Sequence, residues 1–426
     1  MEKNKFEDIR LLDGKNNGMK QKHIKVILST LGPLHLIKSA ETLSNLVDIK
    51  VIQGWIPEWW NRWILLILNR MVGYKLTQTV KKRTPECLKG RNIGIGIPEF
   101  YSHFRRRVLK DELANVKAAV LYGILSQKYL KDADIFHVRS GSGMGGAIEK
   151  AKACGMKVIV DHSIAHPAFM DQQLKNEFEK NGELYAMGMN NPFWQGVLSD
   201  CDKADLLLVN SQFVKDTFVE AGYDEEKIRV VYLGVRTDFS RLKTDYTIGQ
   251  PIKLLFTGSF GFRKGGEYLL KAMNLLNERN VPCELTIVGG TNGATEMLNR
   301  YALPNVKLVG MVPQNNLKGY FQSADMYVFP TLCEGCAQSG MEALASGLPV
   351  ITTRESGLPV VHGQTGIIIP SKNEQAIADA VMKIAVDKEL RTKIGQNAVE
   401  RMACYTWGNY AKEVCKLYEL LVKAVC

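Results

Sequence analysis

The sequence predicts an α/β protein made of two doubly wound, Rossmann-like domains that face each other across a cleft. Segments typical of strands and of helices alternate along most of the chain, which is the pattern of parallel βαβ units. The alternation stops at a polar stretch, residues 236–251, and then restarts. At 426 residues the chain is also too long for one ordinary core.

The first run of alternating segments predicts one parallel sheet. We expect its strands at residues 24–30, 48–54, 92–98, 134–140, 157–163, 205–210 and 228–234. An N-terminal domain over residues 23–235 follows, preceded by a polar segment, 1–22, that does not resemble a signal peptide.

The second run predicts a second sheet after the linker 236–251. Its strands are expected at residues 253–258, 284–290, 306–310, 326–330, 349–353 and 366–370, within a C-terminal domain over 252–404. A terminal helix over 405–426 is expected to pack back on the body, because apolar residues recur there at helical spacing: Tyr410, Val414, Leu417, Leu420, Leu421 and Val425.

Charge and cysteine content restrict the partners and the compartment. The formal net charge of +11 favours an anionic partner, but no nucleic-acid-binding motif is visible. The nine scattered cysteines and the lack of a long apolar run predict a reduced, cytoplasmic protein. Cys333 and Cys336 form an isolated CxxC, and without further ligands at metal spacing we expect no metal.

Two carboxylates, Glu334 and Glu342, lie where a strand and its loop give way to a helix. The run from Gly340 to Ser346 is typical of a helix that ends at Gly347, so Glu334 is expected in the loop and Glu342 in the first turn. The unpaired N–H groups of a helix N-terminus favour phosphate, which leaves the carboxylates for sugar or ribose hydroxyls. Both residues also suit an ordinary helix start, where acidic side chains complement the dipole.

A second glycine-rich strand end carries two cations. Arg263 and Lys264 follow the strand that ends at Gly258, and a glycine pair and a periodic helix come next. Cations, glycines and a helix start together predict a clamp for a diphosphate, although the same loop is compatible with a solvated surface turn.

From FTGSFGFRKGGEYLL through LTIVGG and VKLVG to the stretch that contains CEGCAQSGMEALASGLPVITT, about 150 residues resemble the donor half of family 4 (group 1) glycosyltransferases. These are retaining enzymes with the GT-B fold and a Glu-x7-Glu motif. The resemblance implies that Lys264 binds the donor diphosphate, that Glu334 contacts the transferred sugar and that Glu342 holds the ribose hydroxyls. The family's companion arginine is replaced by Ser259, beside Gly258, and Arg263 is expected to substitute for it.

The resemblance also implies further donor contacts. Backbone N–H groups of Ser339, Gly340 and Met341 would face the phosphates or the sugar. In the first half, Gly32 matches a glycine-bearing loop near the diphosphate, and His162 matches a histidine that approaches the transferred sugar. Asp161 is expected to orient that imidazole or to cap the next turn.

A competing interpretation comes from Gly141, Gly143 and Gly146, which form G-x-G-x-x-G between a strand and a helix. Asp161 follows 20 residues after Gly141, so the dinucleotide fingerprint is satisfied. This motif would make the protein an NAD-dependent oxidoreductase. It usually opens such a domain, however, and three predicted strands precede it here.

Residues 56–83 and 100–110 combine aromatic and basic side chains. The first segment ends in Lys81, Lys82 and Arg83, and the second carries Arg105, Arg106, Arg107 and Lys110. Such segments suit either an anionic membrane surface or a buried helix with solvated cations at its edges.

The resemblance implies transfer of a sugar from a UDP- or GDP-linked donor to a saccharide or lipid-linked acceptor, with no separate cofactor. It implies retention by front-face attack, and a double displacement with Glu334 as nucleophile is the alternative. Synthesis of cell-surface polysaccharide or glycolipid fits this chemistry. A nucleotide-sugar binding protein without transfer activity stays open, because Ser259 departs from the pattern.

Overall fold

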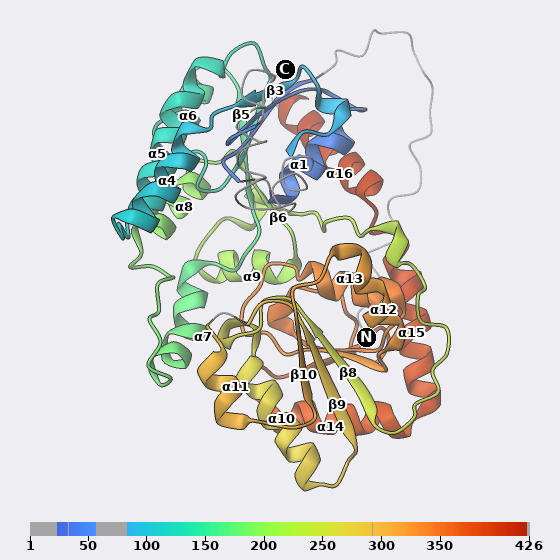
Figure 1. The fold of residues 1–426 in the computed structure, drawn as a ribbon. Coiled ribbons are helices and arrows are strands. Elements are labelled where there is room, and N and C mark those ends of the chain that lie inside the picture. The colour runs from blue at the N-terminus through green and yellow to red at the C-terminus, as the bar shows by residue number, and fades with distance from the viewer. Residues whose placement is uncertain (1–23, 33, 57–82, 292, 424–426) are drawn as a thin grey trace, which may run out of the picture.

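The structure is a computed structural model that describes residues 24–32, 34–56, 83–291 and 293–423. Within these residues the chain forms two lobes, each built on a parallel sheet flanked by helices (Figure 1). The predicted polar segment 1–22 and nearly all of segment 56–83 lie outside the described residues.

The first sheet has seven parallel strands in the order β3-β2-β1-β4-β5-β6-β7. They are β1 (Lys25–Thr30), β2 (Asp48–Gln53), β3 (Asn92–Gly94), β4 (Ile135–Arg139), β5 (Lys157–His162), β6 (Leu206–Val209) and β7 (Ile228–Val230). All seven predicted strands are confirmed. The third is shorter than predicted, because helix α4 (Ile97–Val108) begins three residues after it and accommodates Pro98 in its first turn.

The second sheet has six parallel strands in the order β10-β9-β8-β11-β12-β13. They are β8 (Ile252–Thr257), β9 (Cys283–Val288), β10 (Val306–Gly310), β11 (Met326–Phe329), β12 (Val350–Thr353) and β13 (Ile367–Ile369), so the six predicted strands are confirmed. Both sheets have the doubly wound order, in which strand order reverses at the β1/β4 and β8/β11 neighbours. Ligands bind at the carboxyl ends of strands at such switch points.

Helices flank both sheets. In the first lobe these are α1 (Leu34–Leu43), α4, α5 (Ala114–Ser126), α6 (Ala147–Ala153), α7 (Pro167–Glu179), α8 (Pro192–Asp202) and α9 (Gln212–Glu220). The second lobe contains α10 (Gly266–Glu278), α11 (Thr295–Tyr301), α12 (Leu317–Ser323), α13 (Gln338–Ser346), α14 (Glu374–Val386) and α15 (Lys388–Met402). Polar caps fix several starts; for example, Ser211 accepts a hydrogen bond from the Val214 amide at the start of α9.

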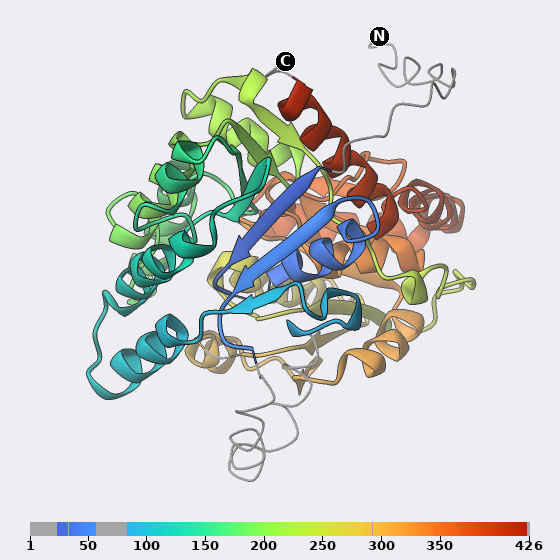
Figure 2. The same ribbon diagram turned by 90° about the horizontal axis from the view of Figure 1, so that it is seen from above.

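The terminal helix α16 (Trp407–Lys423) leaves the second lobe and packs beside α1 on the first (Figures 1 and 2). Tyr410 and Val414 are buried there as predicted, and Tyr418 is buried as well. Leu420 is instead 52% exposed, and Val425 lies outside the described residues. The Tyr418 hydroxyl lies 2.6 Å from Nδ1 of His137 on β4, which ties the helix to the first sheet.

The polar stretch between the two sheets is held on the second lobe. Phe239 and Tyr246 are buried. The Lys243 Nζ donates to the Ala324 carbonyl at 2.7 Å, and the Tyr246 hydroxyl donates to the Gly347 carbonyl at 2.9 Å. Its buried side chains make this segment part of the second lobe's packing, which its polarity had concealed.

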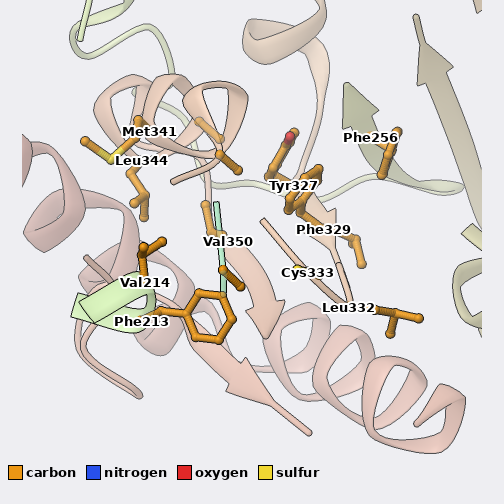
Figure 3. Packing of buried hydrophobic residues seen from close by; sticks show 14 of the residues in the cluster. Phe213, Val214, Phe256, Tyr327, Phe329, Leu332, Cys333, Met341, Leu344 and Val350 are labelled. Atoms are coloured by element: carbon orange, nitrogen blue, oxygen red, sulfur yellow. The ribbon is translucent and has the colours of Figure 1, made fainter. Parts of the chain in front are cut away.

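The lobes are joined by helices of the first lobe that reach the second. Phe213 and Val214 of α9 belong to the same buried cluster as Val350 of β12, and Figure 3 shows them close to that strand. On α7, Glu177 accepts hydrogen bonds from the Tyr268 hydroxyl of α10 at 3.0 and 3.1 Å. The two switch points are therefore held in one packed structure.

Candidate active site

Backbone glycines shape the switch point of the second sheet. β8 ends at Thr257, and Gly258 follows with φ of +126°. Gly289, after β9, has φ of +145°, and a Cβ there would collide with the Gly258 carbonyl. Only glycine allows the two backbones to approach this closely, so neither position carries a side chain at the strand ends.

Two cations converge on one carboxylate near the end of β8. The Arg263 Nη1 lies 2.7 Å and the Lys264 Nζ 2.9 Å from the same oxygen, Oε1 of Glu334. Arg263 Nη1 also donates to the Cys333 carbonyl at 2.8 Å. The structure thus brings together three of the residues that the sequence singled out, whereas Ser259 is exposed.

The charge state of Glu334 follows from these neighbours. Burial raises the pKa of this carboxyl, but the cations Arg263 and Lys264 outweigh burial and hold the pKa below its usual value. Glu334 is therefore an anion at neutral pH. Both Arg263 and Lys264 are already paired with it, so an incoming diphosphate would share or displace this carboxylate.

The N-terminus of α13 follows Glu334 by four residues in the sequence, so its unpaired N–H groups belong to the same loop and helix start. Among the described residues, no acceptor is found for the backbone N–H groups of Gln338, Ser339 and Gly340. The prediction for Met341 is wrong: its N–H is bonded to the Ala337 carbonyl at 3.0 Å, and its side chain is buried in the core. Unpaired N–H groups at a helix start are suited to an anion.

Ser339 is fixed at the switch point by hydrogen bonds. Its Oγ donates to the Thr257 carbonyl at 3.2 Å, and the Tyr327 hydroxyl of β11 donates to the same Oγ at 2.9 Å. Tyr327 is fully buried, as Figure 3 shows among its neighbours. The start of α13 is therefore held firmly over the end of β8.

Glu342 lies in the second turn of α13 rather than in the first, because the helix begins at Gln338. The residue is only 5% exposed, and its carboxylate has no hydrogen-bond partner among the described residues. Burial raises the pKa of Glu342 to about 7, Arg236 counteracts this, and Asp238 adds to it. A buried carboxylate without a partner is available for ligand hydroxyls.

The switch point of the first sheet holds a cavity of about 390 Å³ between the ends of β1 and β4. Gly32 lies on its wall, where the Thr30 Oγ1 donates to the Gly32 carbonyl at 2.7 Å. The cavity is bounded by apolar side chains and a few polar ones, namely Leu31, Ala118, Ala119, Phe193, Trp194, Val197, Ser102, Asn115, Arg139, Ser140, Ser142 and His162.

His162 reaches this cavity from the end of β5. Its Nδ1 lies 2.9 Å from the Ser140 hydroxyl, and its buried Nε2 has no partner among the described residues. Burial lowers the pKa of His162 to about 3, and the nearby Arg139 contributes in the same direction. The imidazole is neutral at physiological pH, and its Nε2 can form one hydrogen bond with a ligand.

Asp161 does not orient that imidazole, because its carboxylate points to the other side of the strand. It lies 3.0 Å from Nε2 of His35 and 3.2 Å from Nη1 of Arg139. Burial raises the pKa of Asp161, but the contacts with His35, His137 and Arg139 hold it well below its usual range. Ser140 and Arg139 were missed in the sequence, although their place at the end of β4, beside β1, is a signal that the switch-point rule provides.

The dinucleotide interpretation of the glycine run fails on geometry. The N–H groups of Gly141 and Gly143 donate to Oδ2 of Asp200 at 2.7 and 2.9 Å, so an internal carboxylate occupies the place where a pyrophosphate would bind. A Cβ at Gly143 would press on Ile148 and on Asp200. These glycines serve the packing of α8 against β4.

The two halves of the site touch through backbone. A Cβ at Gly335 would collide with the Ser163 carbonyl, one residue after His162. The Ser211 Oγ donates to the Gly335 carbonyl, and Glu334 N donates to the Glu355 carbonyl at 2.9 Å. The loop that carries Glu334 therefore rests directly on the segment that follows His162.

The CxxC around Glu334 is part of the core. Cys333 is fully buried, and burial raises the pKa of its thiol to about 12. Both Cys333 and Cys336 are free thiols. In the part of the chain that the structure describes, no group of three His, Cys, Asp or Glu residues is arranged to hold a metal ion.

The fold and the site define the class: two doubly wound lobes with a switch-point site in each are the GT-B fold of glycosyltransferases. Two family models adjoin along the chain, Glycosyltransferase Family 4 over residues 87–239 and Glycosyl transferases group 1 over residues 239–401. The chain belongs to this family of group 1, family 4 glycosyltransferases.

Curated relatives carry glycosyltransferase names. A D-inositol 3-phosphate glycosyltransferase of Corynebacterium urealyticum is 29% identical over 52% of this chain and 58% of its own length. The amylovoran biosynthesis glycosyltransferase AmsK of Erwinia amylovora is 30% identical over 42% of this chain and 47% of its own length. The chain thus spans only about half the length of these relatives.

Solved structures share the fold at low identity. Sucrose-phosphate synthase from Thermosynechococcus elongatus superposes with a TM-score of 0.67 at 19% identity, over 94% of this chain and 100% of that one. Anabaena HepE, solved in complex with UDP, gives a TM-score of 0.61 at 13% identity, over 93% and 99%. Within the described residues, no helix is both long and apolar enough to cross a membrane.

Proposed function

We propose that this protein transfers a sugar from a nucleoside diphosphate sugar to an acceptor hydroxyl. The observation that carries the proposal is the convergence of Arg263 and Lys264 on Glu334 beside the free N–H groups of α13. A diphosphate and a sugar need these groups together: cations and helix N–H donors for the phosphates, and a carboxylate for hydroxyl groups.

The chemical step is the departure of the diphosphate from the anomeric carbon. Negative charge grows on the leaving oxygens, and Lys264, Arg263 and the N–H groups of Gln338 to Gly340 would stabilise it. Glu334, released from part of its pairing, would accept hydrogen bonds from the transferred sugar. Glu342 would accept hydrogen bonds from the ribose hydroxyls, because its carboxylate is buried and free.

The acceptor would enter from the first lobe. The cavity beside His162 has room for a sugar-sized group, and Phe193 and Trp194 offer flat apolar surfaces to it. We propose retention of anomeric configuration by front-face attack, in which the leaving diphosphate takes the acceptor proton. A double displacement through Glu334 is disfavoured, because two cations on one oxygen reduce the nucleophilicity of that carboxylate.

Named relatives and the net charge support the donor and acceptor classes that we propose. UDP is the ligand named for the HepE structure, and AmsK is named for biosynthesis of amylovoran. We propose a UDP- or GDP-linked donor without a separate cofactor, a saccharide or lipid-linked acceptor, and a role in cell-surface polysaccharide or glycolipid synthesis. The protein's net charge of +11 favours anionic surfaces. We therefore propose a cytoplasmic location with peripheral contact to an anionic membrane.

One assay tests the proposal. The protein is incubated with UDP-, GDP- and ADP-sugars, and released sugar and its anomeric proton are followed by NMR. We expect slow release from one donor with the configuration of the donor retained in the first product. Binding of a donor with no release would make the protein a binder, and release of the inverted anomer would refute the proposed mechanism.

A further inference from the structure

The apolar side of helix α4 faces solvent instead of the protein. Ile97, Phe100, Phe104 and Val108 recur at intervals of three or four residues, so they lie on one side. They are 66%, 52%, 59% and 60% exposed, and Leu109 beyond the helix is 53% exposed. An amphipathic helix normally buries this side.

The polar side of α4 faces the protein instead. Glu99 makes a two-point pair with Arg83, with distances of 2.7 and 2.6 Å, and accepts a hydrogen bond from the Trp55 amide at 2.9 Å. Ser102 Oγ donates to Asn115 on α5 at 2.9 Å. Arg83, which the sequence assigned to either a membrane-facing or a solvated cluster, is buried and anchors the helix from inside. Polar contacts hold the apolar side outward.

Positive charge borders the exposed apolar side at Arg107 and Lys110, whereas Arg106 lies four residues after Ser102 on the polar side. Arg105 pairs with Asp111 at 2.7 Å, but among the described residues Arg106, Arg107 and Lys110 form no ion pair. All three are exposed. A row of apolar side chains with unpaired cations beside it complements the acyl chains and anionic headgroups of a bilayer.

The position of α4 fits such a contact. The helix lies at the outer edge of the first lobe, away from the second lobe and from α16 (Figures 1 and 2). Ser102 on its inner side lines the cavity beside His162. One helix thus connects the outer edge of the molecule with the cavity proposed for the acceptor.

We propose that α4 is a membrane-docking helix, which inserts its apolar side at the headgroup layer of an anionic bilayer and places the acceptor cavity next to the lipid. The inference deepens the proposed peripheral contact and rests on the proposed function only for the identity of the cavity. It predicts an acceptor whose sugar is attached to a lipid.

Vesicle flotation with the full chain tests the docking. Wild-type protein is mixed at low salt with vesicles of phosphatidylcholine, alone or with phosphatidylglycerol, and compared with the double variant Phe104→Ser/Val108→Ser. We expect flotation with the anionic vesicles and a loss of about tenfold or more in the variant, since each buried methylene contributes about 0.8 kcal/mol, roughly fourfold. A second variant, Arg107→Gln/Lys110→Gln, should lower flotation by roughly fivefold per charge.

Matched controls separate docking from general effects. Val386→Ser/Leu420→Ser removes apolar side chains that are 83% and 52% exposed elsewhere, and Lys388→Gln/Lys393→Gln removes exposed cations from α15. Both controls should float like the wild type, and all variants should keep the wild-type rate of donor hydrolysis. A failure of flotation with hydrolysis intact would overturn docking alone.

Three other results would overturn the proposal. One is equal flotation of the Phe104/Val108 variant and the wild type. Another is flotation that does not depend on phosphatidylglycerol or on Arg107 and Lys110. The third is a dimer in solution that the Phe104/Val108 variant abolishes, because the apolar side would then be covered by a second copy of the chain.

Discussion

The two switch points of this molecule handle charge in opposite ways. In the second lobe, Arg263 and Lys264 share one oxygen of an ionised Glu334, so the site is densely charged and electrostatically paired before any ligand arrives. In the first lobe, a neutral His162 faces a largely apolar cavity, and the nearby Asp161 and Asp200 are satisfied internally. The difference supports the proposal that one lobe binds a charged donor and the other an acceptor with hydroxyl groups and apolar surfaces.

The largest effect should come from the charged half. Replacing Lys264 by Ala removes a cation from the leaving diphosphate, so we expect turnover to fall by about 100-fold or more, the usual cost of losing one such donor. Turnover is measured with the best donor of the panel. Lys307→Ala, on the exposed edge strand β10, is the control and should retain activity. A loss within about tenfold for Lys264→Ala would mean that the clamp is assigned wrongly.

A smaller effect is expected in the neutral half. His162→Ala removes one hydrogen bond from a ligand, so kcat should fall by about tenfold while the Kd for the nucleoside diphosphate is unchanged. Because the pKa of His162 is about 3, its loss should leave the pH profile above pH 5 as it is. The exposed His362 provides a control variant, His362→Ala. If His162→Ala bound the nucleotide more weakly, the donor would contact the first lobe, and the assignment of donor and acceptor to different lobes would be wrong.

Donor binding in the second lobe should depend on pH because Glu342 titrates near neutrality. Its pKa is raised to about 7, and its ionised form is the better acceptor for ribose hydroxyls. Donor affinity should therefore fall as the pH drops through 7, by at most about tenfold per pH unit. Glu342→Gln should bind more weakly at pH 8 and lose this dependence. Titration calorimetry with the nucleoside diphosphate from pH 6 to 8 measures this dependence. If the variant kept the wild-type pH dependence, Glu342 would not be the group that binds the ribose hydroxyls.

Asp200 should affect stability and leave turnover alone. Burial raises its pKa to about 7 from 3.8, even though the Gly141 and Gly143 amides oppose this. The folded state therefore binds the proton more tightly than the unfolded state. The contribution to the free energy of unfolding is fully present below about pH 4 and is lost as the pH rises towards 7, by at most about 4 kcal/mol.

The variant Asp200→Asn isolates this contribution. Urea unfolding of wild type and variant at pH 5 and pH 8 should show that the variant gains stability relative to the wild type at the higher pH, since an amide can still accept the two N–H groups. Equal pH dependence of the two proteins would show that Asp200 does not titrate in this range. Altered donor turnover would instead tie the glycine run to catalysis.

The sequence predicted the scaffold better than the site. The thirteen strands could be found because a buried parallel strand is a continuous apolar run, as in β5 and β11. Glu334, Lys264 and Glu342 could be found because their motif is local. The pairing of Arg263 with Glu334 crosses 71 positions, and the contact of Asp200 with Gly141 crosses 59, so neither is visible in local spacing. The outward side of α4 could not be read either, since periodicity shows that a helix has an apolar side but not where it points.

Binding of nucleoside diphosphates is the decisive measurement for the proposed donor site in the second lobe. Titration calorimetry of UDP, GDP, ADP and NAD is performed on the wild type, on Arg263→Ala/Lys264→Ala and on the control Lys307→Ala. We expect that one diphosphate binds to the wild type and to the control, that the double variant loses this binding by about 100-fold or more, and that NAD does not bind. Undiminished binding to the double variant, or binding of NAD alone, would contradict this expectation.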